Sequence, residues 1–339
     1  MNNKKLLTTA VAAIFGVSIA NADISLTDNL TLSGFVDASY SNTDSDKRTE
    51  TLGLDQIEVD FAFAGESVSA EVHLDSTGEN VRLEQAFASY DLGNGLTVSG
   101  GKMLNLLGFE SDEPTGQYQN TTAYQDQILD SVGKRYREGI RASFGVEDIA
   151  VGISGYDNGT DPSNFDLAYE AQVIFSGIEN LTVALGYADD DDAAAVINEA
   201  VNVWASYESG QMTVAAEYND IESTTGDGDG YLLLANYTIN DNASITVRYS
   251  EQDVAGAQFE RFTISPSYSF TDNLGALIEF STGEKEVGGV TVDEDIAHEL
   301  AHNSTIKIIE IKGMYNLKTN KELQEICKQN QLALRGNKE

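Results

Sequence analysis

Six charged residues of opposite sign lie on either side of one long connection in the sequence: the acids Glu110, Asp112 and Glu113, and the bases Arg135, Arg137 and Arg141. If the arginines faced the carboxylates across a narrow passage, they would set a transverse electric field. Charged rings of this kind select permeating ions by their charge. The alternative is that the arginines only brace the connection through ion pairs, and the two roles are compatible.

A second motif, His298-Glu299-Leu300-Ala301-His302, has the HExxH spacing that places two zinc-binding histidines on one helical face. A catalytic zinc site needs a third protein ligand, and no histidine follows. We therefore predict no metal site and no cofactor. His298 and His302 remain weak candidates for a zinc-binding module.

The elements around the charged residues alternate between apolar and polar side chains at every second position. Ile57, Val59, Phe61 and Phe63 alternate with polar or small residues, and the pattern returns along the chain. This period is typical of strands that bury one face. We count fifteen such strands before residue 283.

The connections between these strands alternate in length, with exceptions after Asp75 and near Val254. Gly, Asn and Asp mark the short turns, and most of the intervening connections are longer. Short turns at one end and long loops at the other are typical of a transmembrane antiparallel β-barrel, as are tyrosines near strand ends. The fold class predicted is all-β, with about 16 strands, short periplasmic turns, longer external loops and a short α-helical tail.

In such a barrel the apolar parity faces lipid and the polar parity faces the lumen. That parity places four further charged residues inside, next to the six above: Glu58, Asp60, Arg82 and Glu84. All ten are predicted to line a pore constriction.

The connection 104–135 is then the third external loop and the longest. It begins with an apolar knot of Leu104, Leu106, Leu107 and Phe109, which a solvated loop does not need. We expect this loop to fold back into the lumen, where the inner wall buries the knot.

The first 22 residues combine Lys4 and Lys5, an apolar run and an Ala20-Asn21-Ala22 cleavage site, which together indicate a secretory signal peptide. The formal net charge of −35 argues against a nucleic-acid partner, because few bases are available to neutralise phosphates. An acid excess allows a cation-attracting channel instead.

Leu83 to Gln119, above all its LGFE and EPTG strings, and Tyr136 to Phe144 resemble the OmpL-like putative β-barrel porin family of Gram-negative bacteria. The resemblance covers about residues 23–296 and implies a porin fold with passive passage of small solutes. In general porins the third loop enters the pore, which agrees with the expectation for 104–135.

Residues 297–339 do not fit that family. They are basic, and the chain ends Gly336-Asn337-Lys338-Glu339 where such barrels have an aromatic residue. We expect a strand over 305–315, recruited to close the barrel, and a helix over 319–330, with 290–292 as an alternative start of the sixteenth strand. A fusion or frameshift near residue 296 would account for the change.

The sequence thus predicts a signal peptide (1–22), an outer-membrane barrel (23–296) and an atypical tail (297–339). The function predicted is a non-enzymatic porin for small hydrophilic solutes or ions, with mild cation preference. The alternatives are a plugged structural or adhesive barrel, or a zinc-binding HExxH tail. The partners expected are outer-membrane lipid, the outer-membrane assembly machinery, small solutes and, as one form of assembly, two further copies in a homotrimer.

Overall fold

The computed structural model describes residues 24–43, 49–76, 80–123, 135–157, 167–190, 197–223, 226–254, 256–271, 273–287, 290–292 and 304–309. Strands dominate these ranges, and the one helical element in them is the 3-10 turn η1 (Pro114–Gly116). No helix among these residues is long and apolar enough to cross a membrane. The strands are β1 (Ile24–Thr27), β2 (Leu30–Thr43), β3 (Thr49–Ala64), β4 (Val68–Ser76), β5 (Arg82–Gly93), β6 (Leu96–Leu104), β7 (Tyr136–Val146), β8 (Ile149–Asp157), β9 (Leu167–Ile178), β10 (Leu181–Asp189), β11 (Ile197–Ser209), β12 (Met212–Ser223), β13 (Gly228–Asn240), β14 (Ala243–Val254), β15 (Ala257–Thr271), β16 (Leu274–Val287), β17 (Val290–Val292) and β18 (Ser304–Ile309).

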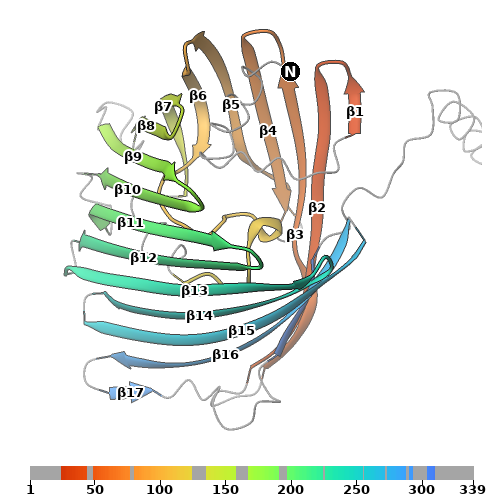
Figure 1. Cartoon of the computed structure of the whole chain (residues 1–339), viewed down its shortest axis with the longest axis vertical. Coiled ribbons are helices and arrows are strands. Elements are labelled where there is room, and N and C mark those ends of the chain that lie inside the picture. Colours follow the sequence, from red (N-terminus) through yellow and green to blue (C-terminus); the bar gives the residue numbers. More distant parts are fainter. Residues whose placement is uncertain are drawn as a thin grey trace, which may run out of the picture.

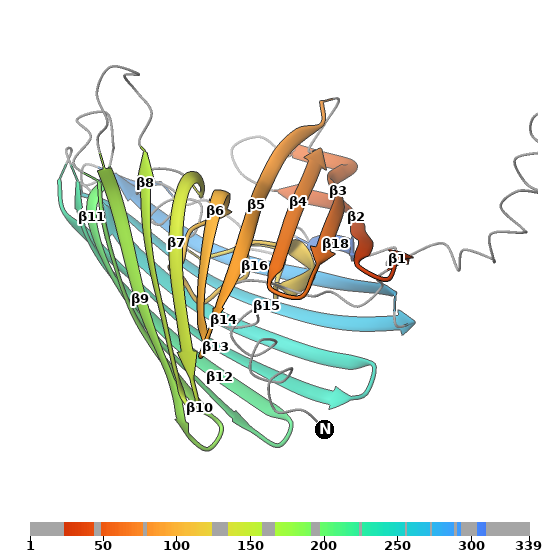
Figure 2. The same ribbon diagram turned by 90° about the horizontal axis from the view of Figure 1, so that it is seen from above.

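The strands form one antiparallel sheet that closes on itself. From β2 to β16 each strand pairs with the next in the chain, and β18 pairs with both β16 and β2. The ring thus contains sixteen strands of the described chain, which confirms the predicted barrel (Figure 1). Figure 2 shows the strands slanting across the wall, as closure of a sheet into a barrel requires.

The seam between β16 and β2 is built from three short strands. β1 pairs with the first residues of β2, β18 pairs with Asp37 to Tyr40 farther along it, and β17 pairs with the last residues of β16. Both sequence candidates for the sixteenth strand therefore contribute pairs. The strand expected over 305–315 is described as Ser304–Ile309, and 310–315 and the helix expected over 319–330 lie outside the described residues.

Tight turns join the strands at one end of the barrel. They lie where Gly, Asn and Asp residues predicted short turns in the sequence. In the β5–β6 turn Asn94 and Gly95 both have positive φ, 57° and 84°, the combination that a two-residue hairpin prefers. A Cβ on Gly95 would lie 2.1 Å from the backbone oxygen of Gly145, near the end of the adjacent strand β7. Glycine is needed there both for its conformation and for this close approach.

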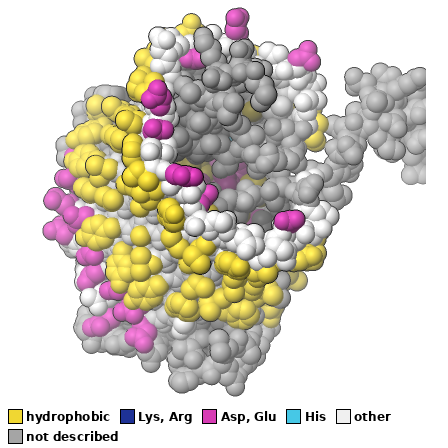
Figure 3. Space-filling model, in the orientation of Figure 1, with side chains coloured by type: hydrophobic (Ala, Val, Ile, Leu, Met, Phe, Trp, Pro, Cys, Tyr) yellow, Lys and Arg dark blue, Asp and Glu magenta, His cyan; other side chains and the backbone are white. Residues whose placement is uncertain are grey.

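The wall has an apolar exterior and a polar interior. Large apolar side chains such as Ile140, Leu185 and Leu233 are more than half exposed, whereas Asn202 and Asn219 are fully buried. Figure 3 shows apolar side chains spread over the outer wall, with acidic side chains along the margin of this region. This inverted arrangement is the one that a bilayer requires of a barrel.

Tyrosines lie in pairs near the ends of neighbouring strands. The rings of Tyr169 and Tyr187 are 6.0 Å apart, and those of Tyr231 and Tyr249 are 5.9 Å apart. Aromatic rings of this kind favour the membrane–water interface.

The outward parity can be tested at the middle of β13. Leu233→Arg would place a charge in hydrocarbon and is expected to lower the free energy of unfolding of the lipid-reconstituted barrel by about 2–4 kcal/mol. Urea unfolding followed by tryptophan fluorescence measures this loss. Thr238→Arg, near the turn end of the same strand, is the matched control, and an equal loss for both variants would contradict the assigned parity.

Candidate functional site

A long loop enters the ring of strands between β6 and β7. Residues 105–123 of this internal loop are described, and they carry η1 into the space enclosed by the wall (Figure 1). The loop stays inside because two kinds of contact hold it, one apolar and one polar.

The apolar contact is made by the knot that the sequence singled out. Leu106 and Leu107 are only 7% and 6% exposed, and Leu107 packs into an apolar cluster on the inner wall, with Phe109 against its edge. Gly186 on β10 makes room for Leu107, because a Cβ there would lie 2.3 Å from the Leu107 Cδ2. The wall residues of this cluster lie on β10 to β13: Ala188, Ala200, Ala215, Ile221, Leu232 and Leu234.

The polar contact is made by two charged residues on β14 and β16, which continue the wall beyond β13. Arg248 on β14 is fully buried, and its guanidinium donates to Glu110 Oε1 at 2.5 Å and to Thr121 Oγ1 at 3.0 Å. The Glu279 carboxylate on β16 accepts hydrogen bonds from the backbone amides of Asn120 and Thr121, at 2.7 and 3.0 Å. These hydrogen bonds are charge-assisted, and they hold the loop after η1.

The start of the loop is held by hydrogen bonds to β9 and β11. The amide of Leu106 donates to Glu170 Oε1 at 3.1 Å, and that of Gly108 donates to Asn202 Oδ1 at 3.2 Å. Asn202 in turn donates to Glu217 Oε1 at 2.6 Å. Buried side chains of the wall thus satisfy backbone groups of a segment that has no secondary structure of its own.

The sequence predicted that three arginines would face three acids of the loop, and one ion pair between the two groups is formed. Arg135 forms an ion pair with Asp112, which also accepts a hydrogen bond from the Tyr136 hydroxyl. Arg137 and Arg141 pair instead with acids of the wall, Asp190 and Glu170 respectively.

Arg141 also touches the loop, donating to the backbone oxygen of Leu104 at 2.5 Å. Both Arg137 and Arg141 are 7% exposed. Their observed contacts are those of bracing groups.

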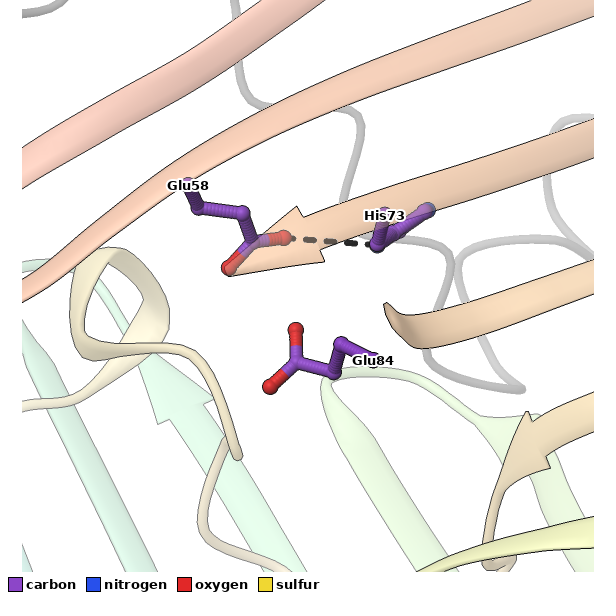
Figure 4. A group of neighbouring side chains, drawn as sticks. All are labelled: Glu58, His73 and Glu84. Carbon is purple, nitrogen blue, oxygen red and sulfur yellow. Dashed lines mark ion pairs between the residues drawn. The ribbon is translucent and has the colours of Figure 1, made fainter. Parts of the chain in front are cut away.

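The inward acids of β3 to β5 gather around the one histidine of the barrel. His73 Nδ1 lies 3.3 Å from Glu58 Oε1 and 3.6 Å from Asp60 Oδ1, while its Nε2 lies 3.2 Å from Glu71 Oε2. Figure 4 shows Glu58 and His73 facing each other with Glu84 below them.

Glu113 of the internal loop approaches the same group of acids. Burial raises the pKa of its carboxyl well above the usual range, and the nearby Glu58 adds to this effect. Arg82 lies at the edge of this group, where it forms a bidentate pair with Asp75, its Nε donating to Oδ1 and its Nη2 to Oδ2, each at 2.7 Å. It is held on the wall and is mostly exposed.

A cavity of about 460 Å³ remains between the internal loop and the wall formed by β2, β3 and β14 to β16. Carboxylates outnumber bases along it by six to two. The charged residues that line it are Asp37, Asp55, Asp112, Glu251, Glu260, Glu284, Arg135 and Arg261.

Sequence reasoning missed Arg248, Glu279 and five of the six acids of this cavity, all except Asp112. Arg248 could have been noticed, because it shares the polar parity of its strand with Thr246 and Ser250 and all three are buried. The partners of Arg248 could not have been identified from the sequence, because Glu110 is 138 residues away in the chain. The zinc candidates His298 and His302 lie outside the described residues.

With fold and lumen described, similarity to known proteins becomes informative. The family profile of the Gram-negative porins matches residues 8–287. The chain belongs to the Gram-negative porin family. This confirms the predicted porin resemblance and the outer-membrane location, and porins are channels rather than catalysts.

One curated porin relative is outer membrane protein U of Vibrio parahaemolyticus, which is 28% identical over 190 residues. The match covers 52% of this chain and 53% of the relative, so the chain spans about half the length of the curated relative it matches.

Two solved porin structures of Vibrio cholerae OmpT share the fold. A variant lacking loop L8 has a TM-score of 0.60 at 12% identity, covering 86% of this chain and 99% of that one. The in-vitro folded trimer form has a TM-score of 0.57 at 13% identity, covering 83% and 98%. At these identities the likeness is one of fold.

Arg248 offers a test of how the internal loop is held. Arg248→Met leaves Glu110 without its guanidinium partner in a buried site, and is expected to lower the free energy of unfolding by about 3–5 kcal/mol. Single-channel conductance is expected to rise or fluctuate, because the loop loses its attachment to β14 and is held after η1 by Glu279.

Arg261→Met removes the same charge from the neighbouring strand and serves as the control in the unfolding measurement. The conductance control is the unsubstituted protein, because Arg261 lines the cavity. If Arg248→Met were no less stable than this control and conducted like the unsubstituted protein, the assigned anchoring role would be wrong.

Proposed function

We propose that this porin lets small hydrophilic solutes and ions diffuse passively across the outer membrane, with a preference for cations. The observation that carries the proposal is the cavity beside the internal loop, with its six carboxylates and two arginines. A water-filled passage lined mainly by one sign of charge concentrates the opposite ion. The formal net charge of −35 acts in the same direction.

In this proposal, fewer residues form the pore constriction than the ten that the sequence suggested. Asp112 and Arg135 border the cavity, whereas Arg137 and Arg141 are occupied with wall acids. We assign selectivity mainly to the cavity acids on β2, β3 and β14 to β16. Arg82, Glu84, Glu58 and Asp60 lie to one side of this path, around His73.

A plugged barrel with a structural or adhesive role is the second candidate. Its support is the density of contacts that fix the internal loop to both sides of the wall. Conductance of the refolded protein in a planar bilayer separates the two, because a plugged lumen would give no channels.

We further propose that the barrel wall has no catalytic role. Barrel enzymes such as outer-membrane phospholipases and proteases use a histidine beside a serine or an aspartate. Both ring nitrogens of His73 face carboxylates, and its contacts are spread over Glu58, Asp60 and Glu71. Incubation of the refolded protein with phospholipid and peptide substrates tests this, and hydrolysis lost on His73→Ala would refute it.

A homotrimer is the assembly we propose, on the precedent of the OmpT trimer form. The mass of the detergent-solubilised protein by light scattering, after correction for bound detergent, would distinguish one copy from three.

Selectivity gives the direct test of the proposed cation preference. At roughly 8 Å in water one unit charge acts on another with about 0.5 kcal/mol, close to a twofold change in local ion concentration. Asp37→Asn and Asp55→Asn are each expected to lower the potassium-to-chloride permeability ratio about fourfold, because loss of one carboxylate roughly halves the local potassium concentration and doubles that of chloride. Reversal potentials under a potassium chloride gradient measure the ratio.

Glu222→Gln and Asp229→Asn remove acids near the loop ends of β12 and β13, away from the cavity, and are the matched controls. A ratio that shifts no more in the cavity variants than in these controls would remove the basis for assigning selectivity to the cavity.

A further inference from the structure

The acids around His73 form a cluster that the channel function does not require. Glu58, His73 and Glu84 come from β3, β4 and β5, and Asp112 and Glu113 come from the internal loop. We call these five residues the lumenal cluster. Figure 4 shows the three wall side chains directed toward a common space.

The donor atoms of the lumenal cluster are close enough together to share an ion. One potential ligand atom each from Glu58, His73 and Glu84 all lie within 4.8 Å of one another, and the same holds for Glu84, Asp112 and Glu113. In a tetrahedral zinc site with bonds of about 2.0–2.2 Å, the ligand atoms are about 3.3–3.6 Å apart. Side-chain shifts of up to about 1 Å would bring the set to bonding distance.

Glu84 supplies an independent sign that a ligand belongs there. It is the residue common to both sets and is 5% exposed, yet its Oε2 has no hydrogen-bond partner within the described part of the chain. A buried carboxylate oxygen without a partner is costly, and such oxygens are normally hydrogen-bonded or bound to a metal. The unpartnered oxygen lies in a group that also offers an imidazole nitrogen.

The cationic side chains nearby are already occupied. Arg135 pairs with Asp112, Arg82 forms its bidentate pair with Asp75, and His73 lies between Glu58 and Glu71. The cluster therefore has more acidic groups than cations in a poorly solvated place, and a dication would stabilise these groups in their ionised form.

We propose that the lumenal cluster binds one divalent cation of the zinc or manganese type. Glu58, His73 and Glu84 of the wall and Glu113 of the loop would be its ligands. A single imidazole among carboxylates favours these ions over magnesium and calcium, which prefer oxygen ligands alone. The bound ion would tie the internal loop to β3 to β5, in addition to its attachments to Arg248 on β14 and Glu279 on β16.

Zinc titration of the refolded full-length protein tests the proposal. After chelator treatment, isothermal titration calorimetry in detergent at neutral pH is expected to show one tight zinc site per chain. All proteins carry His298→Ala and His302→Ala, so that the HExxH motif of the tail cannot contribute. Glu84→Gln and His73→Gln are each expected to weaken zinc binding about 100-fold, the upper end of what losing a supporting group costs a metal site.

Glu260→Gln, which removes an acid from the cavity outside the lumenal cluster, is the matched control and is expected to leave zinc affinity unchanged. Absence of a tight site, or equal affinity in the Glu84→Gln, His73→Gln and control proteins, would overturn the proposal.

X-ray absorption spectroscopy of zinc bound to the chain that carries only His298→Ala and His302→Ala gives a readout that does not depend on how the cluster variants fold. One imidazole nitrogen with the remaining ligands oxygen supports the lumenal cluster. Zinc bound without any imidazole would overturn it, because His73 is then the one histidine left in the sequence.

Discussion

A polar backbone in hydrocarbon must find all its hydrogen-bond partners within the protein, and this constraint governs the whole molecule. An open sheet would leave two edges unsatisfied, so the wall has to close. Closure is achieved by β18 between β16 and β2, with β1 and β17 adding pairs to the same gap. Once the wall is closed, every strand has one face toward lipid and one toward the lumen.

The two faces lead to opposite solutions for the side chains. Outside, large apolar residues are exposed because lipid covers them. Inside, polar side chains of the wall form hydrogen bonds with the internal loop. Its backbone amides donate to Glu170, Asn202 and Glu279, and its Glu110 accepts from Arg248. An apolar patch on the same inner face, centred on Ile221, Leu232 and Leu234, holds Leu107. The lumen is therefore a mixed interior, built partly like a protein core and partly like a channel.

The sequence predicted what depends on neighbours along the chain. Period-two alternation gave the fifteen strands β2 to β16 and the direction of most of their side chains, and Gly, Asn and Asp marked the turns. Strands β2 to β16 are 9 to 16 residues long, whereas about 9–11 residues suffice to span the bilayer, because pairing continues past the lipid-spanning part of strands such as β3. The four-residue β1 was not anticipated, since so short a segment carries little periodicity.

The sequence could not predict which inward side chain meets which. Parity put Arg137 and Arg141 inside, but their partners Asp190 and Glu170 depend on how the sheet curves. Glu279 meets Asn120 across 159 residues of chain, and local patterns carry no information on such a pair. Contacts of the internal loop thus required the three-dimensional arrangement, even though the loop itself was conspicuous in the sequence.

The seam also imposes an order on folding. Tyr40 of β2 pairs with Ile306 of β18, so one edge of the first long strand has to wait for a segment more than 250 residues later in the chain. Contacts at such separation carry a large loop-closure entropy and form slowly. Until then β2 presents a row of free amides and carbonyls to any other strand nearby. Protection of that edge during synthesis and export is consequently as much a requirement of this architecture as the finished wall.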